Sequence, residues 1–272
     1  MRILFITPAI VPYVPKTEVA DLCRYLPQFT QEKGKEIRTF MPEYGCINER
    51  KHQLHEVIRL SGVNVIVGED DHPLQIKVTS LPLDRMQFYF IDSDDYFGKR
   101  GIYTDKEGAE YEDNDARMAF YARGVLEIVK KMRWSPDIIH VHGWFSALST
   151  FFLRTLYKED VIYQNAKLIV SLYDEEFKTP FEKEKFIFRL KTRGVEEEDI
   201  AQLLNAEGKV TYVDLMKKTI DFADGIIQGS ETINPELLSY AQSSGKPFLG
   251  YQGKEYGNTY NDFYDSFFGN KG

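Results

Sequence analysis

Cysteine is scarce in this sequence, which holds only Cys23 and Cys46 among 272 residues. Neither belongs to a Cys-x-x-Cys pair, so we expect no zinc site, redox motif or disulfide framework. Runs of basic residues are also missing, and the formal net charge is -8 at pH 7. An acidic chain without a basic patch is a poor match for a phosphate backbone, so we expect no nucleic-acid partner.

Long apolar runs are missing as well. No segment approaches the length that spans a bilayer, so we expect no membrane-embedded part. The apolar run within Met1–Pro8 is too short for a signal peptide and lacks a small-residue cleavage site. Together with the low cysteine content, these absences predict a cytoplasmic location.

Aromatic side chains are abundant, at 14% of the residues, with 19 Phe and 17 Tyr. They fit either a large aromatic core or a surface on which sugar rings stack. The remaining composition, 43% hydrophobic and 28% charged, is typical of a globular protein. A chain of this length forms one large domain or two small ones.

Short apolar runs alternate with amphipathic segments along the chain. Ile3–Ile6 predicts a buried strand, Glu18–Gln31 a helix and Ile37–Met41 a second strand, which is the order of a βαβ unit. We therefore predict an α/β fold with a Rossmann-like, doubly wound and mostly parallel sheet. Its central strands should lie side by side near residues 3–7, 37–41, 137–142, 167–172 and 225–229. Further helices are predicted at 113–131, 144–157, 182–208, 210–222 and 233–241.

The middle of the chain is less regular. Leu54–Val67 and Leu74–Leu83 predict antiparallel strands or hairpins, and Gln87–Ile91 predicts another strand. Without internal repeats or a low-complexity linker, we expect one domain over residues 1–252. The Gly- and Tyr-rich residues 253–272 are a loose tail or the start of a second domain, and we favour a tail that packs on the first domain.

Three stretches carry a family resemblance, and they occur in the family's order. They are Tyr89-Phe-Ile-Asp92 through Glu127, which includes Gly101-Ile-Tyr103 and Tyr111-Glu-Asp-Asn-Asp-Ala-Arg117; Trp134-Ser-Pro-Asp-Ile-Ile-His140-Val-His142-Gly-Trp144; and Phe222-Ala-Asp-Gly-Ile-Ile-Gln-Gly-Ser230. The sequence resembles bacterial glycogen/starch synthases of the ADP-glucose type over nearly all its length.

The resemblance implies a hexosyltransferase family of the GT-B type, with two Rossmann-like domains and the active site between them. The N-terminal domain holds the acceptor glucan and part of the donor site, and the C-terminal domain makes most contacts to ADP-glucose. These 272 residues match the N-terminal half, the starch synthase catalytic domain. We expect no cofactor and no metal.

Lys16 and Thr17 match the family's Lys-Thr-Gly-Gly-Leu loop, so the resemblance makes them candidates for binding the nucleotide sugar. Glycines there let backbone amides approach the donor's diphosphate at a helix N-terminus. Here the glycines are absent, and Glu18 places a carboxylate where phosphate oxygens would lie. A solvated loop lysine is the alternative for Lys16.

Two further family residues are absent. Gly143 stands where the family has an Asp, and the alignment places Ser171 at a histidine used in the transfer step. His140 and His142 share one face of a strand that leads to the carboxyl edge of the sheet. We interpret His140 as a core histidine and His142 as a site candidate. A metal fragment is the weaker alternative, because no third ligand is evident.

His142, Trp144, Tyr103 and Arg117 are therefore the candidates for binding glucan or sugar. Arg117 could instead pair with an acidic neighbour, and Asp113 is also suited to cap a helix. We expect the loops at 12–17, 92–103, 142–144 and 173–178 to form an exposed aromatic face at the carboxyl edge. Its aromatics would be Tyr13, Tyr96, Phe97, Tyr103, Trp144, Tyr173 and Phe177.

The function predicted first is that of a glycogen synthase-like protein of α-glucan metabolism, a pseudoenzyme that binds a glucan or a partner and does not transfer glucose alone. The alternatives are a working ADP-glucose-dependent subunit completed by a donor-domain chain, and a non-catalytic regulator that binds glucan or nucleotide sugar. For the aromatic face we favour self-capping or a homo-oligomer, then glucan, then a separate donor-domain chain.

Overall fold

The computed structural model describes residues 1–81 and 86–269. Its main sheet has the strand order β12-β11-β8-β7-β1-β2-β6-β5-β3, with β4 paired to β5. The seven strands from β12 to β6 are parallel, and β3, β4 and β5 are antiparallel additions beyond β6. Their bounds are β1 Arg2–Ile6, β2 Glu36–Pro42, β3 His55–Glu56, β4 Val63–Val67, β5 Asp70–Leu81, β6 Met86–Asp92, β7 Ile138–His142, β8 Lys167–Leu172, β11 Gly225–Gln228 and β12 Phe248–Leu249.

The five central strands predicted from the sequence are confirmed as consecutive neighbours, from β11 through β8, β7 and β1 to β2. β1 and β7 are almost completely buried, which is why they read as short, continuous apolar runs. The antiparallel strands in the middle of the chain are also confirmed. The predicted strand Leu74–Leu83 runs to Leu81 as the end of β5, and its last two residues lie outside the described part.

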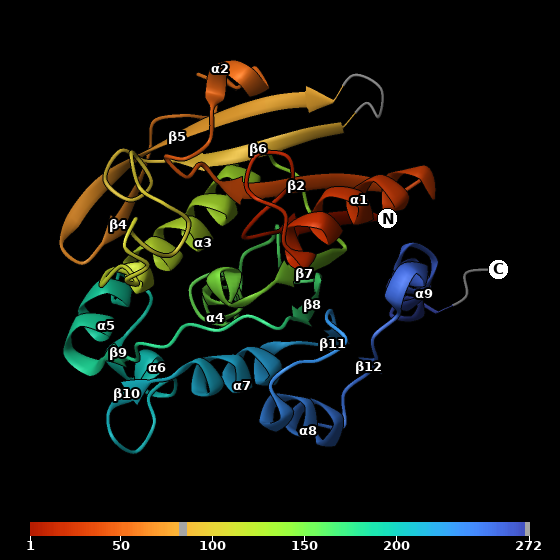
Figure 1. Ribbon diagram of the computed structural model, residues 1–272. Helices are drawn as coiled ribbons and strands as arrows, with labels where there is room; N and C mark the ends of the chain where they lie inside the picture. The colour runs from red at the N-terminus through yellow and green to blue at the C-terminus, as the bar shows by residue number, and fades with distance from the viewer. Residues whose placement is uncertain (82–85, 270–272) are drawn as a thin grey trace.

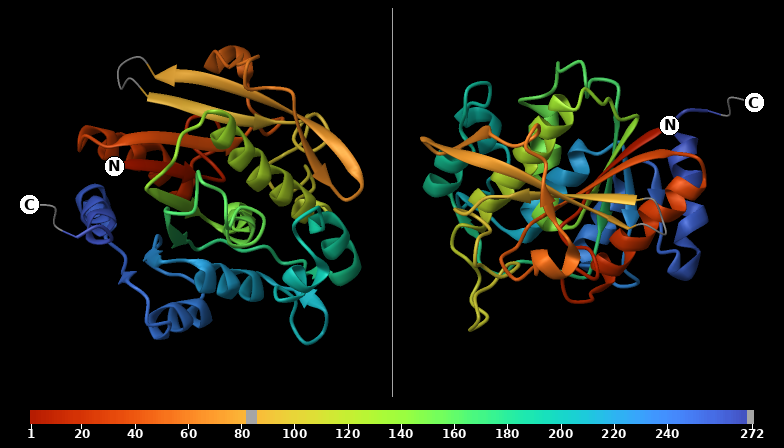
Figure 2. Two further views of the ribbon diagram at one scale, coloured as in Figure 1. Left: turned by 180° about the vertical axis from the view of Figure 1, so that it is seen from behind. Right: turned by 90° about the horizontal axis from the view of Figure 1, so that it is seen from above.

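Helices cover both faces of the sheet (Figures 1 and 2). On one face α1 lies beside α9, and on the other α3, α4, α7 and α8 follow one another. The helices are α1 Glu18–Glu32, α2 Glu49–His52, α3 Asn114–Lys131, η1 Trp144–Ser146, α4 Leu148–Arg154, α5 Lys183–Leu190, α6 Glu197–Ala201, α7 Tyr212–Phe222, α8 Pro235–Ser243, η2 Gly253–Glu255 and α9 Tyr256–Ser266.

Residues 182–208, predicted as one helix, form two short helices, α5 and α6. Gly194 separates them with a positive φ of 93°, which ends any continuous helix at that point. The small strands β9 (Phe181–Glu182) and β10 (Lys209–Val210) pair on either side of these helices. This insertion therefore closes on itself beside the N-terminal end of α3.

The tail folds back onto the domain as α9. Tyr260 and Tyr264 are buried against the sheet, and Tyr264 Oη lies 2.8 Å from His140 Nδ1. At the surface, Lys35 forms an ion pair with Asp265 at 3.1 Å. Residues 253–269 are thus a packed element, while the boundary at residue 252 stays a prediction. Within the described residues, no helix is long and apolar enough to cross a membrane.

Candidate functional site

The carboxyl edge of the parallel strands collects the loops that carry the candidate residues. Because parallel strands all end at one edge, the loops after β1, β6, β7, β8 and β11 meet there. Of the residues named from the sequence, Lys16 and Thr17 line an open pocket, whereas His142, Trp144, Tyr103 and Arg117 do not line it. The edge therefore divides into an open pocket and a buried cluster.

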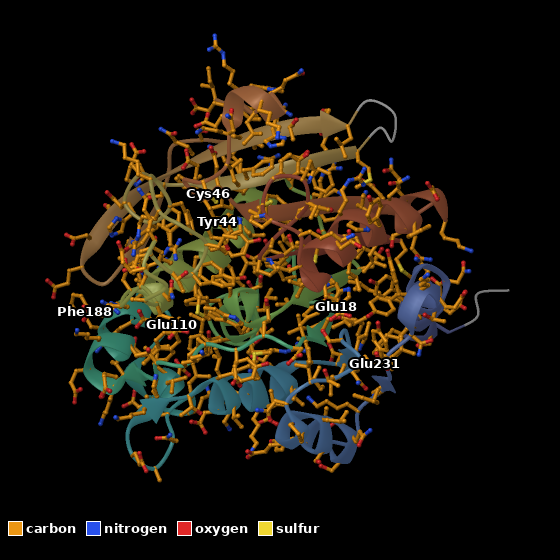
Figure 3. The ribbon with its side chains drawn as sticks, in the orientation of Figure 1. Glu18, Tyr44, Cys46, Glu110, Phe188 and Glu231 are labelled. Carbon is orange, nitrogen blue, oxygen red and sulfur yellow. The ribbon has the colours of Figure 1, made fainter. Side chains whose placement is uncertain are left out.

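The open pocket, of about 420 Å³, lies at the N-terminus of α1. Its lining residues come from the start of α1, from the end of β11 and from the segment that leads into α9: Lys16, Thr17, Glu18, Asp21, Leu22, Gly229, Tyr251, Gln252, Gly253, Lys254, Tyr256 and Tyr260. Figure 3 labels Glu18 at this place, between α1 and the blue C-terminal segment. The tail is thus one wall of the pocket, which the sequence did not indicate.

Thr17 and Lys16 are both engaged with α1 itself. Thr17 is the N-cap residue, and its Oγ1 accepts a hydrogen bond from the Ala20 amide at 3.2 Å. The Lys16 ammonium is exposed and lies 3.3 Å from the Asp21 carboxylate. With Glu18 and Asp21 in the same lining, carboxylates balance the charge of Lys16 and Lys254. The pocket has no net positive charge to offer a diphosphate.

The two strand histidines are neutral and fully buried. His140 is satisfied on both ring nitrogens, by Tyr264 Oη at 2.8 Å and Ser171 Oγ at 2.7 Å, which supports its interpretation as a core histidine. Ser171 is also buried within β8. His142 Nδ1 lies 2.7 Å from Tyr173 Oη, and its Nε2 has no hydrogen-bond partner among the described residues. Burial lowers the His142 pKa to about 3 and that of His140 well below its usual value.

Gly143 is covered by the carboxyl group of Glu175. Gly143 has φ 66° and ψ 173°, and a Cβ built there would lie 2.5 Å from Glu175 Oε1. That oxygen is buried and has no hydrogen-bond partner among the described residues. Burial raises the Glu175 pKa to about 7. Sequence reasoning missed Glu175, because no local pattern shows which loop carboxylate folds over a given glycine.

The predicted exposed aromatic face is wrong. Tyr103 is half-buried, and the other six are buried: Tyr13, Tyr96, Phe97, Trp144, Tyr173 and Phe177. Trp144 is enclosed by Tyr103 and Phe177, whose ring centroids lie 4.7 and 5.1 Å from its own. The loops after β6 and β8 fold over this edge and bury their own aromatics there.

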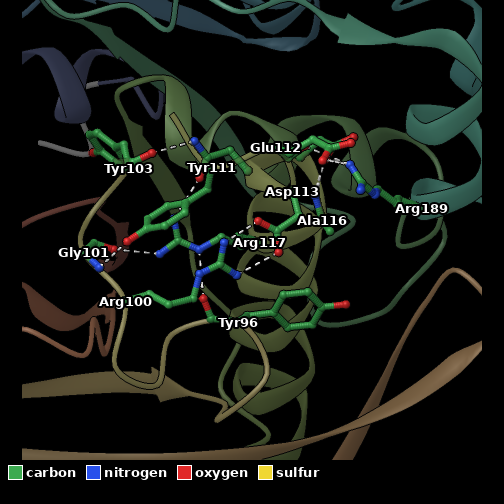
Figure 4. Close-up of polar contacts among 12 residues, drawn as sticks. Tyr96, Arg100, Gly101, Tyr103, Tyr111, Glu112, Asp113, Ala116, Arg117 and Arg189 are labelled. Atoms are coloured by element: carbon green, nitrogen blue, oxygen red, sulfur yellow. Dashed lines mark hydrogen bonds and ion pairs between the residues drawn. The ribbon is translucent and has the colours of Figure 1, made fainter. Parts of the chain in front are cut away.

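Arg117 is fully buried at the centre of a network that shapes the loop after β6 (Figure 4). Its guanidinium donates to the carbonyls of Tyr96, Gly101 and Ile102 at 2.8–3.0 Å and to Asn114 Oδ1 at 2.8 Å. The alternative role for Arg117 was to pair with an acidic neighbour. Its hydrogen bonds instead go to backbone carbonyls and to an amide oxygen. The carboxylate of Asp113 accepts from Arg100 at 2.8 Å and makes no capping bond to α3.

The side chains at this edge suit a neutral ligand that carries hydroxyl groups better than a charged ligand. The open pocket offers two tyrosine rings beside carboxylates and an amide, from Tyr251, Tyr256, Glu18, Asp21 and Gln252. Such groups accept hydrogen bonds from hydroxyls and pack against the apolar faces of sugar rings. Within residues 1–81 and 86–269, no group of three His, Cys, Asp or Glu side chains could hold a metal ion.

Comparison with known proteins assigns the fold and then the family. The catalytic domain of starch synthase IV from Arabidopsis thaliana, solved with ADP and acarbose, matches 92% of this chain and 50% of that one. The TM-score is 0.72 at 18% sequence identity. The fold is therefore that of one Rossmann-like half of a GT-B glycosyltransferase.

The family model described as starch synthase catalytic domain matches residues 2–249, so the chain belongs to that family. A glycogen synthase of Chlorobaculum parvum is 32% identical over 244 residues, which cover 89% of this chain and 48% of that protein. One of Chlorobium luteolum is 35% identical over 174 residues, covering 64% of this chain and 36% of that protein. The chain spans half or less of the length of these relatives.

Proposed function

We propose that this glycogen synthase-like chain binds α-glucan at the pocket beside α1, and that its 272 residues alone do not transfer glucose from ADP-glucose. The observation that carries the proposal is the lining of that pocket. Glu18 and Asp21 stand at the helix N-terminus together with Lys16, and tyrosines of the tail form the opposite wall. We include a cytoplasmic location in the proposal, by analogy with the bacterial glycogen synthases it matches.

Electrostatics favours a neutral ligand in this pocket. A diphosphate would meet two carboxylates at close range, and Lys16 is already paired with Asp21 at 3.3 Å. Glucose transfer also needs preorganised charges that stabilise the departing diphosphate in the transition state. Sugar hydroxyls, in contrast, donate to carboxylates without a repulsive charge.

Ligand-induced stabilisation tests the binding half of the proposal. Maltoheptaose should raise the melting temperature by an amount that grows with the logarithm of its concentration above Kd, since a ligand that binds only the native state stabilises it by mass action. Tyr251→Ala should abolish the shift. Tyr25→Ala is the matched control, because Tyr25 is similarly exposed, at 42% against 38%, but lies outside the pocket lining. Equal shifts in both variants would exclude this pocket as the glucan site.

An incorporation assay tests the catalytic half. Labelled ADP-glucose incubated with glycogen and the purified chain should leave no label in the polymer. Incorporation that Lys16→Ala abolishes would contradict the proposal. It would favour the second candidate, a glucosyltransferase subunit, which is supported by the placement of Lys16 and Thr17 at the N-terminus of a 15-residue helix.

A further inference from the structure

A further open pocket, of about 510 Å³, lies at the opposite edge of the sheet from the pocket beside α1. Its floor is one face of β2, β6 and β5, which lie side by side (Figure 1). The register pairs Tyr89 of β6 with Phe40 of β2 and with Val78 of β5. Arg38, two residues before Phe40, therefore shares that face. Since Arg38 and Gln87 stand near the starts of β2 and β6, the pocket opens at the amino end of the parallel strands.

The pocket is positively charged in a protein whose formal net charge is -8. Arg38, Arg59 and Lys131 line it, and no Asp or Glu does so among residues 1–81 and 86–269. The pocket beside α1, in contrast, places Glu18 and Asp21 next to its lysines. Three cations without a carboxylate in the lining attract an anion and disfavour a cationic ligand.

Arg38 is already fixed by contacts within the protein. Its guanidinium carbon lies 5.4 Å from the centroid of the buried Trp134 ring, and its Nη1 donates to the Ile37 carbonyl at 3.0 Å. The Glu36 carboxylate lies 3.6 Å from Arg38 Nη2. The same carboxylate lies 3.3 Å from Arg2 Nε and accepts from Trp134 Nε1 at 2.7 Å, so one negative charge serves two arginines. A cation held in this way loses little conformational entropy when it binds an anion.

Lys131 and Arg59 belong to the walls formed by the end of α3 and by the segment before β4. Lys131 Nζ donates to the carbonyls of Leu60 and Ser61, at 3.2 and 3.1 Å, which brings the ammonium beside the residue that follows Arg59. Both cations are exposed, and neither forms an ion pair within the described part of the chain. Their charges are therefore available to a ligand.

The rest of the lining is apolar or aromatic apart from the Gln87 amide. It consists of Val57, Leu60, Val78, Tyr89, Met132 and Trp134. A bare anion would leave this surface in contact with water, whereas a ligand with an apolar ring covers it. The volume falls within the range of roughly 300–1,000 Å³ that small organic ligands occupy. Two guanidinium groups and an ammonium also match the oxygens of a phosphate monoester, which carries a charge of about -1.5 to -2 at pH 7.

We propose that this pocket binds a small phosphate monoester that carries a planar apolar ring. The phosphate lies among Arg38, Arg59 and Lys131, and the ring packs on the aliphatic side chains beside them. The site is independent of the function proposed above, because it shares no residue with the pocket beside α1. A phosphorylated small molecule bound here would act on the protein without blocking that pocket.

NMR titration of the whole chain with phenyl phosphate tests this site. We expect saturable shifts in the amide signals of residues 57–60 and 131–134, and none around Tyr251. Inorganic phosphate lacks the ring and phenol lacks the anion, so each should bind at least about tenfold more weakly than phenyl phosphate. Phenyl phosphate that binds no more tightly than either of them overturns the proposal.

Substitution of the exposed cations locates the phosphate. Arg59→Gln should weaken the binding of phenyl phosphate about tenfold, because a charge-assisted hydrogen bond is lost. Lys131→Gln is the second variant and should have an effect of similar size. Arg193→Gln is the matched control and should leave the affinity unchanged, since Arg193 is also exposed but lies outside the lining. Equal affinities in all three variants, or shifts confined to the pocket beside α1, overturn the site.

Discussion

At the scale of single residues, the missing side chain at Gly143 helps to explain why the carboxyl edge of the sheet is buried. A backbone with φ 66° and ψ 173° is a conformation reserved for glycine, and the absence of a side chain leaves room for the Glu175 carboxyl group. The loop after β8 can therefore fold down onto β7 and bury Trp144. An aspartate at position 143 would conflict with both the backbone and Glu175.

Gly143→Ala should lower the free energy of unfolding by roughly 1–3 kcal/mol for the backbone conformation alone. The clash of its Cβ with Glu175 Oε1, at 2.5 Å, adds to that loss. Glu175→Ala in the same background should relieve the clash and restore that part of the free energy of unfolding, but not the part lost to the backbone conformation. Urea denaturation of the two single variants and the double variant measures each part. Wild-type stability in Gly143→Ala would show that Glu175 does not occupy this space.

Glu175 should also make stability depend on pH. Its pKa is raised from 4.5 to about 7 by burial, so the folded state holds the proton more tightly than the unfolded state. Ionising the buried Glu175 lowers the free energy of unfolding. This loss is absent below pH 4.5, grows between pH 4.5 and 7, and is complete above pH 7. The wild type should lose roughly 3 kcal/mol across this window relative to Glu175→Gln. Parallel stability profiles of the two proteins, measured by denaturation at each pH, would contradict this.

At the scale of elements, the sequence predicts best where burial is complete on both faces. The runs around Ile3 and Ile138 are apolar because helices cover both sides, and periodicity then suffices. It fails for residues 182–208, where Gly194 and a two-residue strand pair break a charged segment into two helices. Contacts with distant elements, such as Arg189 with Asp115, help to hold these helices in place.

The attachment of α9 can be tested at Tyr264. Tyr264→Phe keeps the ring but removes the hydroxyl that lies 2.8 Å from His140 Nδ1, which leaves a buried polar atom unsatisfied. The expected loss of stability is about 1–3 kcal/mol. Tyr260→Phe, on the same helix and also buried, is the control and should change stability less. Equal losses in the two variants would mean that the hydrogen bond to His140 contributes nothing specific.

At the scale of the whole molecule, the sequence predicts which edge of the sheet the candidate loops reach. It does not predict how exposed their side chains are. Lys16 and Thr17 could be assigned to an open loop because a helix start follows them directly. The burial of Trp144 depends on Tyr103 and on the loop around Phe177, which are far from it in sequence. The wall that Tyr251 gives to the first pocket likewise depends on how the tail returns. Long-range packing of this kind leaves no local pattern.

The burial of the edge aromatics predicts that the chain is a monomer in solution. An open aromatic face would favour a homo-oligomer, because large exposed apolar patches mark assembly interfaces. Light scattering at micromolar concentration should therefore give a mass near 31.6 kDa. The strongest alternative interface is on α1, where Tyr25 and Phe29 are each 42% exposed on one helical face. A doubled mass that Tyr25→Glu with Phe29→Glu returns to the monomer value would contradict the prediction and place the interface on α1.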